Sequence, residues 1–517
     1  MLKKHKNTQK LPFIIILFIF AIVFITLLSY TASPLFTKHI YGDSFFYKIA
    51  GKGVLDGIIP FRDISSQKGP FFLLFEGFIE FLNQLFNSYY LGTYIVEIIN
   101  IFLCMLIWYS WGTKLTKNRN FSLIAVLITM FVFITYTFDV GNMTEEFSLL
   151  PISISINYAL DYFVDNKDKV KTSTGFIVGL MGAIAFWIRP NNATQILCVL
   201  LFFFIILVQK KQLSVIIKNG LAFSASFILF SAIILAFYHY NGALDDLIYQ
   251  CFTYNATSYV SGSSFFNIIN FFKLSALYGF IFGSIVMIWI KKDDAKFRYL
   301  CIFSLCLNIP LLASYYVVSS NYNHYLMFFA INSIIFSSQI YLFVKDSANV
   351  KPCISIIVLI VLLFGSSNCI RKSILSAKTS IEMIIHPEKT FFEGYNEYNS
   401  EVSDDIFEIT DYMNKRIPES QKKSVSVPTQ YPCIYYFSNT YPFYHEGSYE
   451  WVQTFSKEKQ EEFYSALFNN SPQWVVLKNG TLDYAEDNMF LEFILENYSV
   501  DYSNNSFCLY HLSNSAF

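Results

Sequence analysis

The sequence predicts a polytopic α-helical membrane protein that crosses the bilayer about eleven times and carries a C-terminal α/β domain. Three observations predict this architecture: an apolar composition, a series of long apolar stretches, and a change of charge near residue 371. Hydrophobic residues make up 54% of the 517 residues, and charged residues only 15%. A soluble chain of this length cannot bury so much apolar surface in its core. We therefore expect lipid hydrocarbon to surround the excess.

Uninterrupted apolar stretches of about 20 residues are typical of transmembrane helices. The predicted spans are 11–28, 91–111, 121–137, 147–164, 173–188, 193–209, 219–238, 269–290, 297–316, 325–344 and 353–370. Four lysines precede the first span. Basic residues also precede the apolar core of a cleaved signal peptide, so this is a competing interpretation. That core usually has about 7–15 residues, so the longer run here favours a retained anchor.

The loops between the spans predict the orientation. Every second loop carries basic residues: Lys114, Lys117 and Arg119; Lys167, Lys169 and Lys171; Lys210, Lys211 and Lys218; Lys291, Lys292, Lys296 and Arg298; Lys345 and Lys351. The intervening loops 138–146, 239–268 and 317–324 contain neither Lys nor Arg. Basic loops remain in the cytoplasm. We therefore expect a plasma-membrane protein with a cytoplasmic N-terminus and an extracytoplasmic C-terminal domain.

Residues 1–370 form the predicted transmembrane domain, and residues 33–90 form its first outer loop. The segment 70–86 in this loop is apolar but contains two glutamates. Counting it as a span would invert every later loop and break the charge rule. We therefore predict a helix that lies at the outer interface of the bilayer. The segment 43–55 has the same amphipathic character.

Residues 371–517 differ from the rest of the chain in charge, with 21 acidic and 11 basic side chains. Short β-like runs alternate there with helical patterns. The runs are 424–427, 433–437, 474–478 and 507–512, and the helical patterns are 457–468 and 488–496. This alternation predicts a small α/β domain. Its sequence shows no nucleophile elbow, phosphate loop or metal-ligand spacing, so we expect it to assist acceptor handling rather than chemistry. Cys433 and Cys508 could pair, but their spacing does not require it.

The outer loops hold most of the side chains that could carry chemistry. These are Asp43, Arg62, Asp63, Lys68, Glu145, Glu146, Arg189, His324 and Tyr325. The predicted topology brings all of them to one side of the bilayer. Such a set at a lipid interface suits a substrate that is half lipid and half polar. The net charge of −1 gives no indication of a nucleic-acid partner.

The stretch from Asp43 to Pro70 reads D-S-F-F-Y…G-I-I-P-F-R-D-I…Q-K-G-P. It resembles the first outer loop of bacterial GT-C glycosyltransferases, and more narrowly the family 39, RgtA/B/C/D-like branch. Shorter blocks follow in the expected order: G-N-M-T-E-E (141–146), I-R-P-N (188–191), G-A-L-D-D-L (242–247) and H-Y (324–325). The resemblance covers residues 1–345. The chain departs from it at Asp43-Ser44, where the family has an acidic pair.

This resemblance implies an inverting transfer of a sugar from a polyprenyl-phosphate donor to a cell-surface glycan or glycolipid at the outer leaflet. An acceptor hydroxyl is a weak nucleophile, so a carboxylate must take its proton, and Asp43 is the candidate base. The leaving group is a phosphate, which cationic groups should stabilise. Arg189 is the first candidate for that role, followed by Lys68 and Arg62.

The remaining candidates concern the sugar and a metal ion. Glu145, Glu146 and His324 are candidate ligands of a divalent metal ion, the one cofactor that the resemblance suggests. Asp63 and Tyr325, together with these three residues, are candidates to orient the substrate. The missing second carboxylate beside Asp43 leaves the metal pattern of the family incomplete.

Each main candidate also has a structural interpretation. Asp43 could cap a helix, and Arg189 could extend toward lipid head groups. Glu145 and Glu146 could simply begin a helix, where acidic residues are favoured.

Two other functions use related substrates. A transporter or flippase of lipid-linked sugars commonly has internal repeats and ionisable groups in the middle of the membrane. This sequence shows no evident repeat, and its charges gather on one predicted face. A polymerase or ligase of lipid-linked sugars usually concentrates its polar residues in one late outer loop, whereas here the first loop is the richest. The position of the polar residues therefore favours a transferase.

Overall fold

The computed structural model describes residues 11–37, 40, 42–138, 140–164, 170–258, 274–317, 322–345, 352–386, 400–428, 430–445, 452, 457–483 and 488–513. Contacts divide the chain into two compact units. The helical unit comprises Met1–Ser29, Tyr94–Phe237 and Tyr254–Ser380. The mixed unit comprises Tyr30–Thr93, Tyr238–Thr253 and Ile381–Phe517. The first outer loop thus belongs to the same unit as the C-terminal region.

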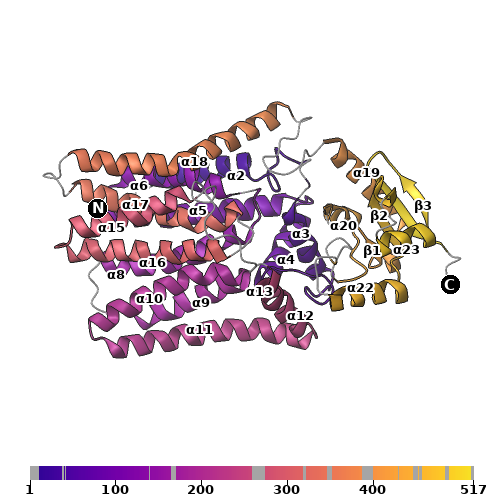
Figure 1. Cartoon of the computed structure of the whole chain (residues 1–517), viewed down its shortest axis with the longest axis horizontal. Helices are drawn as coiled ribbons and strands as arrows, with labels where there is room; N and C mark the ends of the chain where they lie inside the picture. Colours follow the sequence, from indigo (N-terminus) through magenta and orange to yellow (C-terminus); the bar gives the residue numbers. More distant parts are fainter. Residues whose placement is uncertain are drawn as a thin grey trace. The chain divides into compact units, whose positions relative to one another are not determined.

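The helical unit consists of helices, most of which are long, apolar and labelled in Figure 1. They are α2 (Leu11–Leu28), α5 (Leu91–Thr116), α6 (Arg119–Ile128), α7 (Thr135–Thr137), α8 (Thr144–Val164), α9 (Thr172–Ile188), α10 (Thr194–Gln209), α11 (Leu213–Tyr240), α13 (Asn255–Ser258), α15 (Ser275–Ile290), α16 (Ala295–Val317), α17 (Met327–Lys345) and α18 (Pro352–Ile385). A π-helical turn, η1 (Thr129–Ile134), joins α6 to α7. Two 3-10 turns, η2 (Pro190–Ala193) and η4 (Asn323–Leu326), precede α10 and α17.

The predicted spans fall on these helices and turns. Span 121–137 runs through α6, η1 and α7, span 193–209 begins in η2, and span 325–344 begins in η4. Of the span 269–290, residues 275–290 form α15, and residues 269–273 are outside the described residues. Seven helices in the described part of the chain are long and apolar enough to cross a membrane, and α9 and α15 are shorter apolar helices. The predicted polytopic helical fold is therefore confirmed. The number of spans and the orientation stay predictions, and Lys167, Lys169 and Lys351 of the predicted inner loops are not among the described residues.

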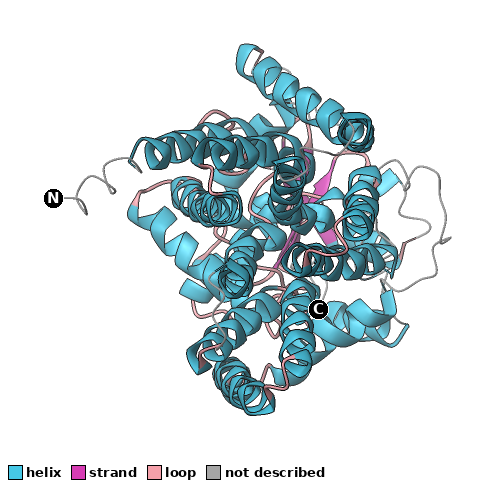
Figure 2. Ribbon diagram, turned by 90° about the vertical axis from the view of Figure 1, so that its left-hand side faces the viewer, coloured by secondary structure: helices cyan, strands magenta, loops and turns pink. Residues whose placement is uncertain are grey.

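Small and polar residues hold the helices of this unit together. A Cβ atom on Gly179 of α9 would lie 2.4 Å from the carbonyl oxygen of Phe223 in α11, so only glycine permits this approach. The indole of Trp108 in α5 donates a hydrogen bond to Ser153 of α8 over 2.8 Å. Pairs such as α8 with α9 and α16 with α17 pack side by side, and Figure 2 shows many of the helices end-on. This scaffold positions Arg189, which directly follows α9.

The mixed unit contains two helices from the first outer loop and a small sheet, the magenta strands of Figure 2. Its helices are α3 (Asp43–Leu55), α4 (Pro70–Leu85), α12 (Leu244–Ile248), α19 (Ser400–Arg416), α20 (Cys433–Ser438), α22 (Lys457–Asn469) and α23 (Met489–Asn497). The turn η3 (Tyr249–Tyr254) is π-helical, and η5 (Glu419–Gln421) is 3-10. The strands are β1 (Val425–Ser426), β2 (Trp474–Lys478), β3 (Tyr498–Ser503) and β4 (Phe507–Leu512).

The four strands form one mixed sheet in the order β1-β2-β4-β3. Strand β1 pairs with β2 in parallel, whereas β2 with β4 and β3 with β4 are antiparallel. The predicted α/β character of the tail is thus confirmed. Cys433 and Cys508 are both free thiols, so no disulfide joins them.

One predicted strand is wrong: residues 433–437 form helix α20 instead. The run C-I-Y-Y-F has high β propensity, but propensity yields to packing. Ile434 and Tyr435 are buried together, and the Tyr435 hydroxyl lies 3.0 Å from the amide of Val427, from which it accepts a hydrogen bond. The helix then ends at Asn439, whose φ of 54° lies in the left-handed region that asparagine tolerates.

Helix α20 packs against the two helices of the first outer loop. The ammonium of Lys52 in α3 donates to the carbonyl oxygen of Tyr436 over 3.1 Å and also to the Asn439 side chain. The Tyr436 hydroxyl donates to Glu80 of α4 over 2.7 Å. Burial raises the pKa of Glu80 and lowers that of Lys52. The C-terminal region is therefore a packing partner of the first outer loop.

We expect Tyr436→Phe to destabilise the mixed unit by about 1–3 kcal/mol, because the buried carboxyl group of Glu80 loses a hydrogen-bond donor. Thermal and denaturant unfolding of the purified variant measure this effect. Tyr502→Phe is the matched control, since the Tyr502 hydroxyl donates to the exposed Glu408 over 2.6 Å. Exposed interactions of this kind contribute little. Equal unfolding midpoints for the two variants would show that the α20 contact does not stabilise the unit.

Candidate functional site

The predicted base, Asp43, is the exposed first residue of α3. The N-cap position is held by Gly42, whose φ of 97° suits glycine, and no side chain caps this end of the helix. Asp43 is thus not the capping residue. One turn later, the hydroxyl of Tyr47 donates to Asp43 Oδ2 in a long hydrogen bond of 3.4 Å.

The predicted cation Lys68 lies close to the same tyrosine. Its ammonium is 5.7 Å from the ring centroid of Tyr47, a cation–π arrangement. Tyr47 itself is buried, with 3% of its surface exposed. Gly69-Pro70 then begins α4, with Pro70 in the first turn, where its missing amide hydrogen costs nothing. One fixed aromatic side chain therefore contacts both Asp43 and Lys68, and we name these three residues the Tyr47 group.

Arg62 and Asp63 form a pair of their own within the loop between α3 and α4. Two guanidinium nitrogens of Arg62 donate to the Asp63 carboxylate, both over 2.8 Å, and a third donates to the carbonyl oxygen of Asn241. Partial burial raises the pKa of Asp63, but the hydrogen bonds from Arg62 and the Ile59 amide outweigh this and hold it below the usual value. The pair shapes the loop, and its predicted role toward the substrate stays a prediction.

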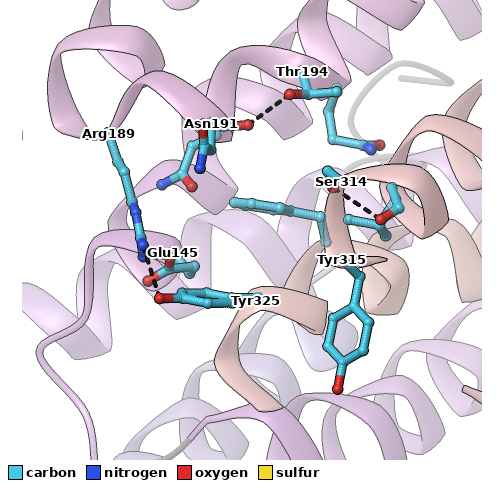
Figure 3. A pocket seen from close by; sticks show the side chains of 11 residues that line it. Glu145, Arg189, Asn191, Thr194, Ser314, Tyr315 and Tyr325 are labelled. Atoms are coloured by element: carbon cyan, nitrogen blue, oxygen red, sulfur yellow. Dashed lines mark hydrogen bonds and ion pairs between the residues drawn. The ribbon is translucent and has the colours of Figure 1, made fainter. Parts of the chain in front are cut away.

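In the helical unit, Arg189 ends α9 and turns into the protein. Pro190 restricts the residue before it to extended backbone, and Arg189 has φ −162° and ψ 125°. Its guanidinium forms an ion pair with Glu145 of α8 and donates to the Tyr325 hydroxyl over 2.9 Å. It also lies 4.5 Å from the centroid of the Tyr325 ring. Figure 3 shows the three side chains converging.

A cavity of about 40 Å³ adjoins these residues. It is lined by Glu145, Arg189, Asn191, Asn192, Thr194, Gln195, Leu311, Ser314, Tyr315, Tyr325 and Phe328 (Figure 3). Amide, hydroxyl and aromatic groups dominate this lining, and its two ionic side chains neutralise each other. A buried pair of opposite charges is stable only with additional hydrogen bonds, such as the one that Arg189 donates to the Tyr325 hydroxyl. The arrangement provides a pocket between helices α8, α10, α16 and α17 that is lined by polar and aromatic side chains and has no net side-chain charge.

The three predicted metal ligands point to different partners. Glu145 pairs with Arg189, whereas Glu146 accepts a hydrogen bond from the Asn142 amide over 3.1 Å. His324 is buried and lies edge-on to Tyr325, 4.6 Å between centroids. In the part of the chain that the structure describes, no three His, Cys, Asp or Glu side chains gather as a metal site would require. These residues do not fit a preformed metal centre, and the metal requirement stays a prediction.

Tyr47 is not among the candidate residues that the sequence predicts. Tyr47 lies four residues after Asp43, a spacing that places both on one face of a helix and could have been recognised. Glu97 of α5 accepts a hydrogen bond from the Asn142 amide over 2.6 Å, in the loop before α8. Such loop contacts depend on tertiary packing and leave no local pattern.

Comparisons with known proteins rest on structure, because no family model and no curated protein matches the sequence. The structure is similar over 97% of this chain to the crystal structure of ArnT from Cupriavidus metallidurans bound to undecaprenyl phosphate, with a TM-score of 0.58, 9% identity and 98% of that chain covered. This chain has the GT-C fold. The archaeal oligosaccharyltransferase AglB from Archaeoglobus fulgidus, in complex with an inhibitory peptide and a dolichol-phosphate, is also similar. Its TM-score is 0.55 at 11% identity, and the alignment covers 99% of this chain and 75% of AglB. The predicted GT-C architecture is therefore confirmed.

Proposed function

We propose that this GT-C protein transfers a sugar from a polyprenyl-phosphate donor to a cell-surface glycan or glycolipid at the outer leaflet. The observation that carries the proposal is the Tyr47 group, in which one buried aromatic side chain contacts a carboxylate and an ammonium. A transfer from a lipid phosphate needs a base for the acceptor and a cation for the leaving phosphate. The likeness to ArnT and AglB, whose structures hold lipid phosphates, supports this choice of donor.

The proposed reaction is a single displacement at the anomeric carbon. Asp43 takes the proton of the acceptor hydroxyl while the acceptor oxygen bonds to that carbon. The bond from carbon to the phosphate oxygen breaks, and the polyprenyl phosphate leaves with the electron pair. Its phosphate is already an anion, so no general acid is required. Attack from the opposite face inverts the configuration of the sugar.

In the proposed reaction, Lys68 stabilises the negative charge of the leaving phosphate. The ammonium sits over the Tyr47 ring, which limits the directions in which its flexible stem can extend. Arg189 is proposed as a second phosphate-binding cation in the helical unit. Its buried ion pair with Glu145 means that a phosphate must share or replace that carboxylate to reach the guanidinium.

Mass analysis of cell-surface glycans, with and without this protein, tests the function in cells. We expect one sugar branch to be lost while the glycan backbone stays intact. Loss of the whole backbone would indicate a polymerase or ligase. Build-up of intact lipid-linked sugar on the inner leaflet would indicate a flippase.

A further inference from the structure

The loop that carries Lys68 has an unusual backbone conformation. Phe61 has φ 73°, in the left-handed region that bulky residues rarely adopt. Its side chain is fully buried and packs edge-on against Tyr238, 5.3 Å between ring centroids. The surroundings must hold such a residue in place, and strain of this kind is common at functional sites.

Gln250, on the π-helical turn η3, holds this loop at two points. Its Nε2 donates to the carbonyl oxygen of Phe61 over 2.9 Å, and its Oε1 accepts from the amide of Ser66 over 2.9 Å. The side chain is buried, with 5% of its surface exposed. The side-chain amide of a glutamine carries a donor and an acceptor in one plane, which these two hydrogen bonds require. These two hydrogen bonds to the loop backbone thus take the place of those that a helix or strand would make.

The next residue acts on Lys68 directly. The Cys251 thiol donates to the carbonyl oxygen of Lys68 over 3.0 Å and is buried. The turn η3 therefore holds the loop at three backbone positions, the last of which is that of Lys68 itself. Cys251 and Lys68 are 183 residues apart in the sequence, so this contact joins two distant segments of the chain. Irregular π-helical turns are frequent where a structure serves a site.

We infer that Gln250 and Cys251 are positioning residues that place the Lys68 ammonium for the donor phosphate. This inference rests on the proposed role of Lys68. Neither residue needs to touch the substrate, because each acts on the backbone that carries the cation. Displacing a charged group by about 1 Å can cost as much as 10²-fold in rate. The hydrogen bonds of η3 prevent such a displacement.

The test is a double-mutant cycle on the purified full-length protein, with a polyprenyl-phosphate sugar as donor and a cell-wall glycan fraction as acceptor. We expect Gln250→Ala to raise KM for the donor by roughly 10-fold, with a smaller change in kcat. In a Lys68→Ala background the same change should have little further effect, because the group it positions is gone. Cys251→Ser keeps a donor toward Lys68 and should retain more activity than Cys251→Ala.

Gln421→Ala is the matched control. Its amide oxygen accepts a hydrogen bond from Trp474 of β2 over 2.8 Å in the same unit. This variant should leave KM unchanged. If Gln250→Ala fails to fold, Gln250→Glu replaces it in the cycle. Glutamate keeps the size of the side chain and the acceptor for the Ser66 amide, but it loses the donor to Phe61.

Two outcomes overturn the inference in distinguishable ways. If Lys68→Ala alone has normal KM and kcat, the proposed role of Lys68 fails and the inference fails with it. If Lys68→Ala is impaired but the Gln250 variant raises KM by the same factor in both backgrounds, the role of Lys68 stands. In that case Gln250 affects the site by another route.

Discussion

Asp43→Asn is expected to lower sugar transfer by about 10²-fold or more while the protein still inserts into the membrane. Asn keeps the shape of the side chain and can still contact the Tyr47 hydroxyl, but it cannot accept a proton from the acceptor. We expect the substitution to leave the structure of α3 unchanged, because Asp43 is exposed and does not cap this helix. Initial rates with the purified variant at saturating donor and acceptor measure the effect.

Asp245→Asn provides the matched control for this change. Asp245 is also exposed and also lies in the first turn of a helix, α12, within the same unit. It should transfer sugar at the normal rate. Equal rates for Asp43→Asn and Asp245→Asn would eliminate Asp43 as the base.

The second large effect concerns Arg189. Arg189→Lys should remain impaired by roughly 10-fold or more, because an ammonium cannot reproduce the planar, two-pronged contact with a carboxylate and a phosphate. Arg189→Ala should be worse, with the defect in donor use. The change to Ala also leaves Glu145 buried without its ion-pair partner, which costs about 3–5 kcal/mol in comparable cases. Loss of stability could therefore hide the loss of binding.

The double variant Arg189→Ala/Glu145→Gln separates these two effects. It removes both charges, so we expect most of the stability to return. Donor KM and transfer rate should nevertheless stay impaired. Full activity in a stable double variant would show that Arg189 serves only to neutralise Glu145.

The regular elements were the most predictable part of the fold. Strands 474–478 and 507–512 match β2 and β4 residue for residue, because each is a short β-branched or aromatic run with clear ends. Helix α19 was missed, although Ile406, Ile409 and Met413 follow helical spacing and are buried. Residues 433–437 have strand-like composition, and their packing against α19 and α3 explains the helix.

The contacts of the candidate site residues are less predictable from the sequence than the regular elements are. The spacing of Asp43 and Tyr47 on one helix face is local and visible in the sequence. The ion pair between Arg189 and Glu145 joins residues 44 positions apart, and it arises because α8 packs beside α9. Gln250 has no signature at all, since a buried glutamine acquires its role only from the loop that it meets.

Proteoliposomes test the proposed sugar transfer directly. The purified protein is reconstituted with a polyprenyl phosphate that carries a radiolabelled sugar, and a cell-wall glycan fraction is added outside. We expect the label to appear on the glycan while free polyprenyl phosphate accumulates in equal amount, and we expect Asp43→Asn to slow both by about 10²-fold or more. The account is contradicted if the labelled lipid crosses the bilayer intact, or if it remains unchanged in the presence of the wild-type protein.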